Sequence, residues 1–246
     1  MLIELYGPPG CGKTTFAHAL AQRMQTRGVT AEVLLSYQPG TYRSSTDPAG
    51  LVYAARRVLS AAANLIVMTC MAAAKRRSFA LAMKLIATLP PSNPIWLLRY
   101  SQYILRLADT WNHRSADGIA IFDQAFVQAV CSLALLTWRA DEPSLNHALD
   151  IVPESDLTIR LNVPKAILTS RLAGRINRES FMERLFEADL GTNLRAAEIA
   201  NRLDVLLGTR GRAIMSFSPI DELTLEDALT QAEEEIMNKL QSTGRR

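Results

Sequence analysis

The chain has 246 residues and a net charge of +3, with 48% hydrophobic and 21% charged residues. This composition is typical of a folded globular protein and excludes a charge-rich disordered chain. The basic residues are scattered and form no tail or stripe, so no nucleic acid partner is expected.

The first predicted element is an apolar strand, Leu2–Tyr6, which leads directly into a glycine-rich loop. The loop matches the phosphate-binding pattern G-x-x-x-x-G-K-[ST] at every defined position. Its glycines let backbone N–H groups surround phosphate oxygens, and the following helix adds the partial positive charge of its N-terminus. The residues predicted to bind ATP are Gly7, Pro8, Pro9, Gly10, Cys11, Gly12, Lys13, Thr14 and Thr15.

Two side chains of this loop have specific expected roles. Lys13 is predicted to reach the β- and γ-phosphates and to act in catalysis, and Thr14 to place its hydroxyl on Mg²⁺. The predicted cofactors are therefore ATP and Mg²⁺. Cys11 is expected to contribute its backbone amide rather than its thiol.

A helix is predicted from about Lys13 to Thr26, ended by Gly28, and a second strand at Ala31–Ser36. The long stretch before the third strand predicts a helical insertion at about residues 41–116, with a helix around Ile95–Trp111 after a proline-rich break. Within it, the Ala-rich segment Val58–Ala74 is too short and too often interrupted by polar residues for a clear membrane span. A buried core helix is favoured over an interface or a membrane contact.

The third predicted strand, Ile119–Asp123, ends in a carboxylate. Carboxyl ends of parallel strands open into the crevice where such sheets bind ligands, so Asp123 is predicted to be catalytic and metal-binding. It is expected either to hold Mg²⁺ through water or to take the acceptor's proton. The competing structural role is to cap a helix at Gln124–Arg139. Since Gln124 replaces the second acid of an ATPase motor, transfer is favoured over hydrolysis.

Strands at Leu157–Val163 and Ala213–Phe217 complete the set. Strands that alternate with helices indicate a parallel sheet covered on both faces. The predicted fold class is α/β, a three-layer P-loop NTPase fold with a five-stranded parallel sheet. Because no flexible linker divides the chain, residues 1–246 are expected to form a single domain.

Four later segments carry a family resemblance: Leu34–Thr41, Asp123-Gln124, Asp156–Pro164 and Ser218–Leu229. In their order and spacing they resemble the thymidylate kinase and deoxynucleoside kinase group. Gln124 stands where that family has arginine and Gln38 where it has glutamate, so the resemblance leaves the acceptor open.

The resemblance also implies an arginine-bearing lid at about residues 171–183. Arg171 and Arg175, four residues apart, share a helix face and are predicted to close over the transferring phosphate, with a solvated helix end as the alternative. Acceptor contacts are predicted for residues near the ends of the second and third strands and in the insertion. They are Arg43, Arg99, Tyr100, Gln124 and Gln128.

The predicted function is an ATP-dependent phosphotransferase of the nucleotide-kinase type, with a small-molecule phosphate acceptor as partner. A nucleotide or nucleoside acceptor is favoured, and a kinase of a sugar or other hydroxyl compound and a non-catalytic ATP-binding regulator are the alternatives. Three widely spaced cysteines and the direct entry from Met1 into a strand favour a cytoplasmic protein. The protein is also expected to be able to form a homodimer.

Overall fold

The computed structural model describes residues 1–35, 73–113, 118–137, 140–176 and 190–242, and of residues 73–75, 172–176 and 190–194 the backbone alone. Its five strands are all parallel and have the order β2-β3-β1-β4-β5. They are β1 (Leu2–Tyr6), β2 (Ala31–Leu34), β3 (Ile119–Phe122), β4 (Leu157–Leu161) and β5 (Ile214–Phe217). The predicted five-stranded parallel sheet is confirmed.

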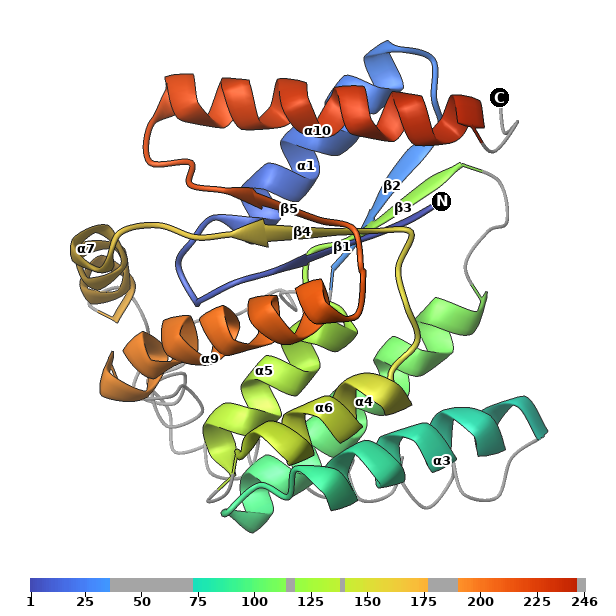
Figure 1. The fold of residues 1–246 in the computed structure, drawn as a ribbon, viewed down its shortest axis with the longest axis vertical. Coiled ribbons are helices and arrows are strands. Elements are labelled where there is room, and N and C mark those ends of the chain that lie inside the picture. Colours follow the sequence, from blue (N-terminus) through green and yellow to red (C-terminus); the bar gives the residue numbers. More distant parts are fainter. Residues whose placement is uncertain (36–72, 114–117, 138–139, 177–189, 243–246) are drawn as a thin grey trace, which may run out of the picture.

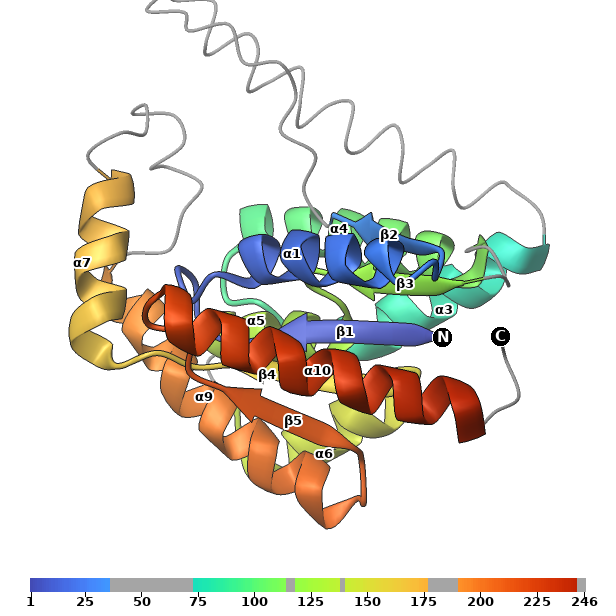
Figure 2. The same cartoon turned by 90° about the horizontal axis from the view of Figure 1, so that it is seen from above.

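Helices cover both faces of this sheet, which makes three layers (Figure 1). One face carries α1 (Lys13–Thr26) and α10 (Glu222–Ser242). The other carries α3 (Ala73–Thr88), α4 (Pro94–His113), α5 (Phe126–Leu136), α6 (Glu142–Ile151) and α9 (Leu190–Thr209). The helix α7 (Lys165–Ile176) stands at one end of the sheet, beside the carboxyl ends of the strands (Figure 2).

The alternation of side chains along β1 explains the two cores. Leu2 and Tyr6 belong to the apolar cluster beneath α4, α5 and α9, whereas Ile3 and Leu5 belong to the cluster beneath α1 and α10. Successive residues of a strand point to opposite faces, and a parallel sheet buried on both faces is apolar on both. The fully buried residue Glu4 is the exception in this strand.

The element boundaries differ from the predicted ones mainly at strand ends. The second to fifth strands are each one or two residues shorter than predicted, as frayed ends commonly are. The first helix is confirmed at Lys13–Thr26, and α4 begins at Pro94 after the proline-rich break. Most of Val58–Ala74 lies outside the described residues. Within the described ranges, no helix is both long and apolar enough to cross a membrane.

Candidate functional site: a phosphate loop beside a strand-end carboxylate

The phosphate loop leaves β1 at Gly7 in a conformation that favours glycine. The φ angle of Gly7 is +147°, and an added Cβ would lie 2.1 Å from the Leu161 carbonyl oxygen. Gly12 forms the N-cap of α1 with a φ of +96° and leaves the helix start without a side-chain cap. Gly7 therefore excludes a larger residue, and the positive φ of Gly12 disfavours one. The first amides of α1 have no acceptor within the helix.

The Lys13 side chain lies inside this loop. Only 7% of Lys13 is exposed, and its ammonium group donates to the carbonyl oxygens of Gly7 at 2.9 Å and Pro8 at 3.1 Å. The same nitrogen lies 3.7 Å from the Cys11 sulfur. A buried ammonium held by backbone carbonyls within the loop is positioned beside the surface where a polyphosphate would bind.

Thr14 and Asp123 meet at the carboxyl ends of the neighbouring strands β1 and β3. The Thr14 hydroxyl donates to an Asp123 carboxylate oxygen at 3.1 Å, although 109 residues separate them in the chain. Asp123 is only 3% exposed. It does not cap the following helix, since α5 begins at Phe126 with Ala125 as its N-cap, not at Gln124. The capping alternative is therefore wrong: the carboxylate turns toward the loop instead.

This pair lies at the topological switch point of the sheet. From β1 the chain crosses on the α1 face to β2, whereas from β3 it crosses on the α5 face to β4. The two connections diverge at the carboxyl ends of the neighbouring strands β1 and β3. Ligands of doubly wound sheets bind outside such a point, which is where the loop and Asp123 lie.

A hydroxyl and a carboxylate are the oxygen ligands that Mg²⁺ prefers, so Thr14 and Asp123 fit this ion. Within the described ranges, no group of three or more His, Cys, Asp or Glu residues is arranged around a common metal position. A divalent cation at Thr14 and Asp123 would therefore complete its coordination with phosphate oxygens and water.

The predicted acceptor residue Gln128 contacts the phosphate loop directly. Its side-chain oxygen accepts from the Gly7 N–H at 3.0 Å, and Gln128 is 5% exposed. Next to it, the buried Glu4 carboxylate accepts from the Val127 N–H at 3.1 Å and from the Ser155 hydroxyl at 3.0 Å. Burial raises the pKa of Glu4, while these hydrogen bonds lower it in part. β1 and its loop are thus tied to the first turn of α5.

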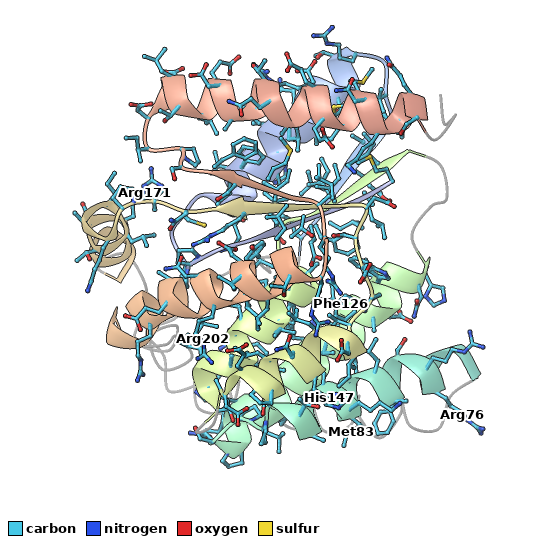
Figure 3. All side chains as sticks on the ribbon, viewed as in Figure 1. Arg76, Met83, Phe126, His147, Arg171 and Arg202 are labelled. Atoms are coloured by element: carbon cyan, nitrogen blue, oxygen red, sulfur yellow. The ribbon has the colours of Figure 1, made fainter. Side chains whose placement is uncertain are left out.

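Arg171 reaches the same loop from the opposite, exposed side. Its guanidinium donates to the Gly10 carbonyl at 3.3 Å and to the Ile220 carbonyl at 3.4 Å. Figure 3 shows the residue on the side of α7 that faces the sheet. Arg175 lies one turn later on α7, and its side chain is outside the described residues, as is most of the predicted lid.

The remaining acceptor candidates are distributed around α4. Arg43 lies outside the described residues. The Arg99 guanidinium carbon lies 5.1 Å from the Trp96 ring centroid, and Tyr100 packs between Trp96 and Tyr103. Gln124 is partly exposed, and its carbonyl oxygen lies 3.4 Å from the Tyr103 hydroxyl. Acceptor contact by these residues stays a prediction.

A polar network that the sequence did not predict lies beneath the loop. Arg160 of β4 is 6% exposed, contacts Asn201 and forms an ion pair with Asp204, which also accepts from the Tyr6 hydroxyl. Burial lowers the pKa of Arg160 and raises that of Tyr6. The missed signal was an arginine inside an apolar strand, because a buried cation needs a partner. The Asn201 and Asp204 pair, three residues apart on α9, supplies it.

A cavity of about 610 Å³ opens near Arg171, between the start of α7, α9 and the connection from β5 to α10. Leu168, Ile220 and Asn201 are among its lining residues. It lies at the β4 and β5 side of the loop, opposite to Asp123.

Comparison with known proteins supports the assignment of the loop. The sequence model of the AAA family, the ATPase family associated with various cellular activities, matches residues 3–48. This range contains β1, the loop, α1 and β2, and with the geometry above it shows a P-loop NTPase unit in the N-terminal part of the chain. No curated protein matches the sequence significantly.

Among solved structures, the chain is similar to deoxyadenosine kinase from M. mycoides. The complex with bound dCTP is 14% identical, with a TM-score of 0.44 over 98% of this chain and 100% of that chain. The complex with bound dATP is 15% identical, with the same TM-score and coverage.

Proposed function

We propose that this protein is an ATP-dependent phosphotransferase that moves the γ-phosphate of ATP to a nucleoside or nucleotide. The observation that carries the proposal is the bond from Thr14 to Asp123 beside the buried Lys13. Phosphoryl transfer depends mainly on positioning and on neutralising charge, and these three side chains provide both.

Each residue has a distinct proposed role. The loop amides and Lys13 bind the β- and γ-phosphates, and Thr14 and Asp123 hold Mg²⁺, which neutralises charge on the phosphates when bound. The acceptor oxygen attacks phosphorus as the bond to the bridging oxygen of ADP breaks, and a hydroxyl acceptor loses its proton to water while ADP leaves as the anion. Arg171, already at the loop, stabilises the charge that develops on the transferring group.

Transfer is favoured over hydrolysis because Gln124 follows Asp123. A motor ATPase uses a second carboxylate here to activate water, and an amide has no comparable basicity. Although the matched AAA family includes hydrolytic ATPases, the match ends at residue 48, before this position.

The aromatic rings on α4 favour a phosphate acceptor that contains a planar base. Trp96, Tyr100 and Tyr103 form a contiguous row, with ring centroids 6.1 Å and 5.9 Å apart. The inner end of the row lies beside the proposed metal site, because the Tyr103 hydroxyl donates to the backbone carbonyl oxygens of Gln124 and Ala125, both at 3.4 Å, directly after Asp123. Such a row can stack a planar base, and Arg99 beside Trp96 can meet a phosphate.

The cavity near Ile220 offers room for the nucleoside part of ATP. A triphosphate on the loop has Asp123 on the β3 side, so the opposite β4 and β5 side is left for the donor base. Donor and acceptor would then approach the loop from opposite sides, as transfer in line requires.

The test is transfer of label from γ-labelled ATP to a panel of nucleosides, nucleoside monophosphates and sugars. The proposal predicts label on at least one nucleoside or nucleotide, and none with the Lys13→Ala variant. Transfer to sugars alone would show that the acceptor is a sugar and not a nucleoside or nucleotide. Tight ATP binding without transfer to any acceptor would instead support a regulatory protein.

A further inference from the structure

Gln128 has a contact that the proposed transfer chemistry does not use. It lies on α5, on the acceptor side of the sheet, yet its side-chain oxygen accepts from the Gly7 N–H at 3.0 Å. Gly7 is the first residue of the phosphate loop and is buried together with Gln128. Without this oxygen, the buried Gly7 N–H would lose the hydrogen bond to Gln128, which costs free energy.

The orientation of the Gln128 amide is set by a second residue. Its nitrogen donates to the Ser132 hydroxyl at 3.4 Å, one helical turn further along α5. This bond directs the nitrogen away from Gly7 and leaves the oxygen toward the loop. The Ser132 side chain also lies beside the Tyr100 side chain on α4. The chain of contacts runs from the loop through α5 to the insertion.

We propose that Gln128 is a positioning residue that holds Gly7, and with it the phosphate loop, in the conformation that binds the β- and γ-phosphates, with Ser132 fixing the orientation of the Gln128 amide. The inference rests on the proposed function in one respect: the loop is taken to bind ATP.

The geometry of Gly7 explains why its position needs support. Its φ of +147° and the close Leu161 carbonyl leave the backbone in a conformation that only glycine occupies readily. A glycine left without a fixed partner has more accessible conformations than any other residue. The Gly7 carbonyl also accepts from Lys13. A rotation of the backbone at Gly7 would therefore move both the N–H groups of the loop and the ammonium group of Lys13.

The test compares MgATP affinity, measured by titration calorimetry, for Gln128→Leu, Ser132→Ala and the double variant. Gln128→Leu is expected to weaken MgATP binding about tenfold, and Ser132→Ala about threefold. Because both act through one amide, the double variant should bind no more weakly than Gln128→Leu alone.

Gln25→Leu is the matched control. Gln25 also binds a backbone group with its amide, donating to the Ala31 carbonyl at 2.7 Å, but it lies at the end of α1 remote from the loop. This control should lose stability on heating and keep wild-type MgATP affinity. A purely structural role for Gln128 would make the two glutamine variants behave alike.

Three results would overturn the inference. They are wild-type affinity in Gln128→Leu, affinity losses in the double variant that simply add, and an equal loss of affinity in Gln25→Leu. If Gln128→Leu does not fold, the milder Ser132→Ala still decides, since unchanged affinity there contradicts the orienting role. Failure of the wild-type protein to transfer phosphate would count against the proposed function and leave this binding test intact. Absence of MgATP binding by the wild type would contradict both.

Discussion

Two regions of the molecule reach the phosphate loop, and they differ in how firmly they hold it. On the buried side, Asp123 and Gln128 are 3% and 5% exposed and contact Thr14 and Gly7 at 3.1 Å and 3.0 Å. On the outer side, the exposed Arg171 contacts the loop at 3.3 Å. The buried contacts come from β3 and α5 in the core, whereas Arg171 comes from α7 at the end of the sheet.

This difference separates two tasks that phosphoryl transfer requires. Groups that hold the donor phosphates act best when they are fixed before the substrate binds, since no reorganisation is then needed. A cation that follows the moving phosphoryl group needs freedom to adjust, and a long exposed arginine has it. The buried side therefore serves binding and the metal, and the exposed side serves the transition state. Variants on the two sides should differ in size and kind of effect.

The largest effect is expected for Lys13→Ala. The ammonium group is the loop's own buried cation, and its loss leaves the β- and γ-phosphates without their main charge partner. Transfer should fall by ~10³-fold or more. Steady-state rates with labelled ATP measure this effect. A loss of only a few-fold would contradict a role of the loop in phosphoryl transfer.

Asp123→Asn should have the next largest effect. The amide keeps the shape of the side chain and removes the charge that would hold Mg²⁺, so kcat should fall by about 10² to 10³-fold. The loss should shrink as the magnesium concentration rises. Asp150→Asn, at an exposed carboxylate of α6, is the control and should leave the rate unchanged. Equal rates for the two variants would contradict the proposed metal site.

The loop and the five strands are predictable from the sequence because a motif and short apolar runs are local signals. The closeness of Thr14 and Asp123 is also predictable, since carboxyl ends of adjacent parallel strands meet. The Gln128 contact with Gly7 and the Arg160 contact with Asp204 are different, because each depends on how a helix packs across the sheet. No local pattern sets the rotation of α5 or α9, so these partners become visible only in three dimensions.

Arg171→Ala is expected to lower kcat about tenfold, with little change in the KM for ATP. The side chain is exposed, so each contact is worth only about 1 kcal/mol. Arg171→Lys should recover part of the rate, because it retains charge without the planar fork. Arg202→Ala on α9 is the control, an exposed arginine away from the loop (Figure 3). A loss as large as that of Lys13→Ala would erase the distinction between the two sides.

The smallest effect on activity is expected for Glu4→Gln, less than about twofold. Its informative property is stability. Burial raises the pKa of Glu4 above its ordinary 4.5, so the folded chain keeps this proton to higher pH than the unfolded chain does. The Glu4 contribution to the free energy of unfolding is therefore fully present below pH 4.5 and is lost as pH rises toward the folded-state pKa.

Urea unfolding of wild type and Glu4→Gln at pH 5 and pH 8 isolates this contribution, because the other titrating groups are shared. The wild type should lose stability relative to the variant as the pH rises. A change of opposite sign would show that the Val127 and Ser155 hydrogen bonds outweigh burial.

The most direct test of the central claim is titration of the protein with ATP, with and without Mg²⁺, for wild type and Thr14→Ala. If the loop and Asp123 together form the donor site, the wild type will bind MgATP more tightly than metal-free ATP, and Thr14→Ala will lose this difference. Identical affinities with and without Mg²⁺ in the wild type, or no ATP binding at all, would contradict it.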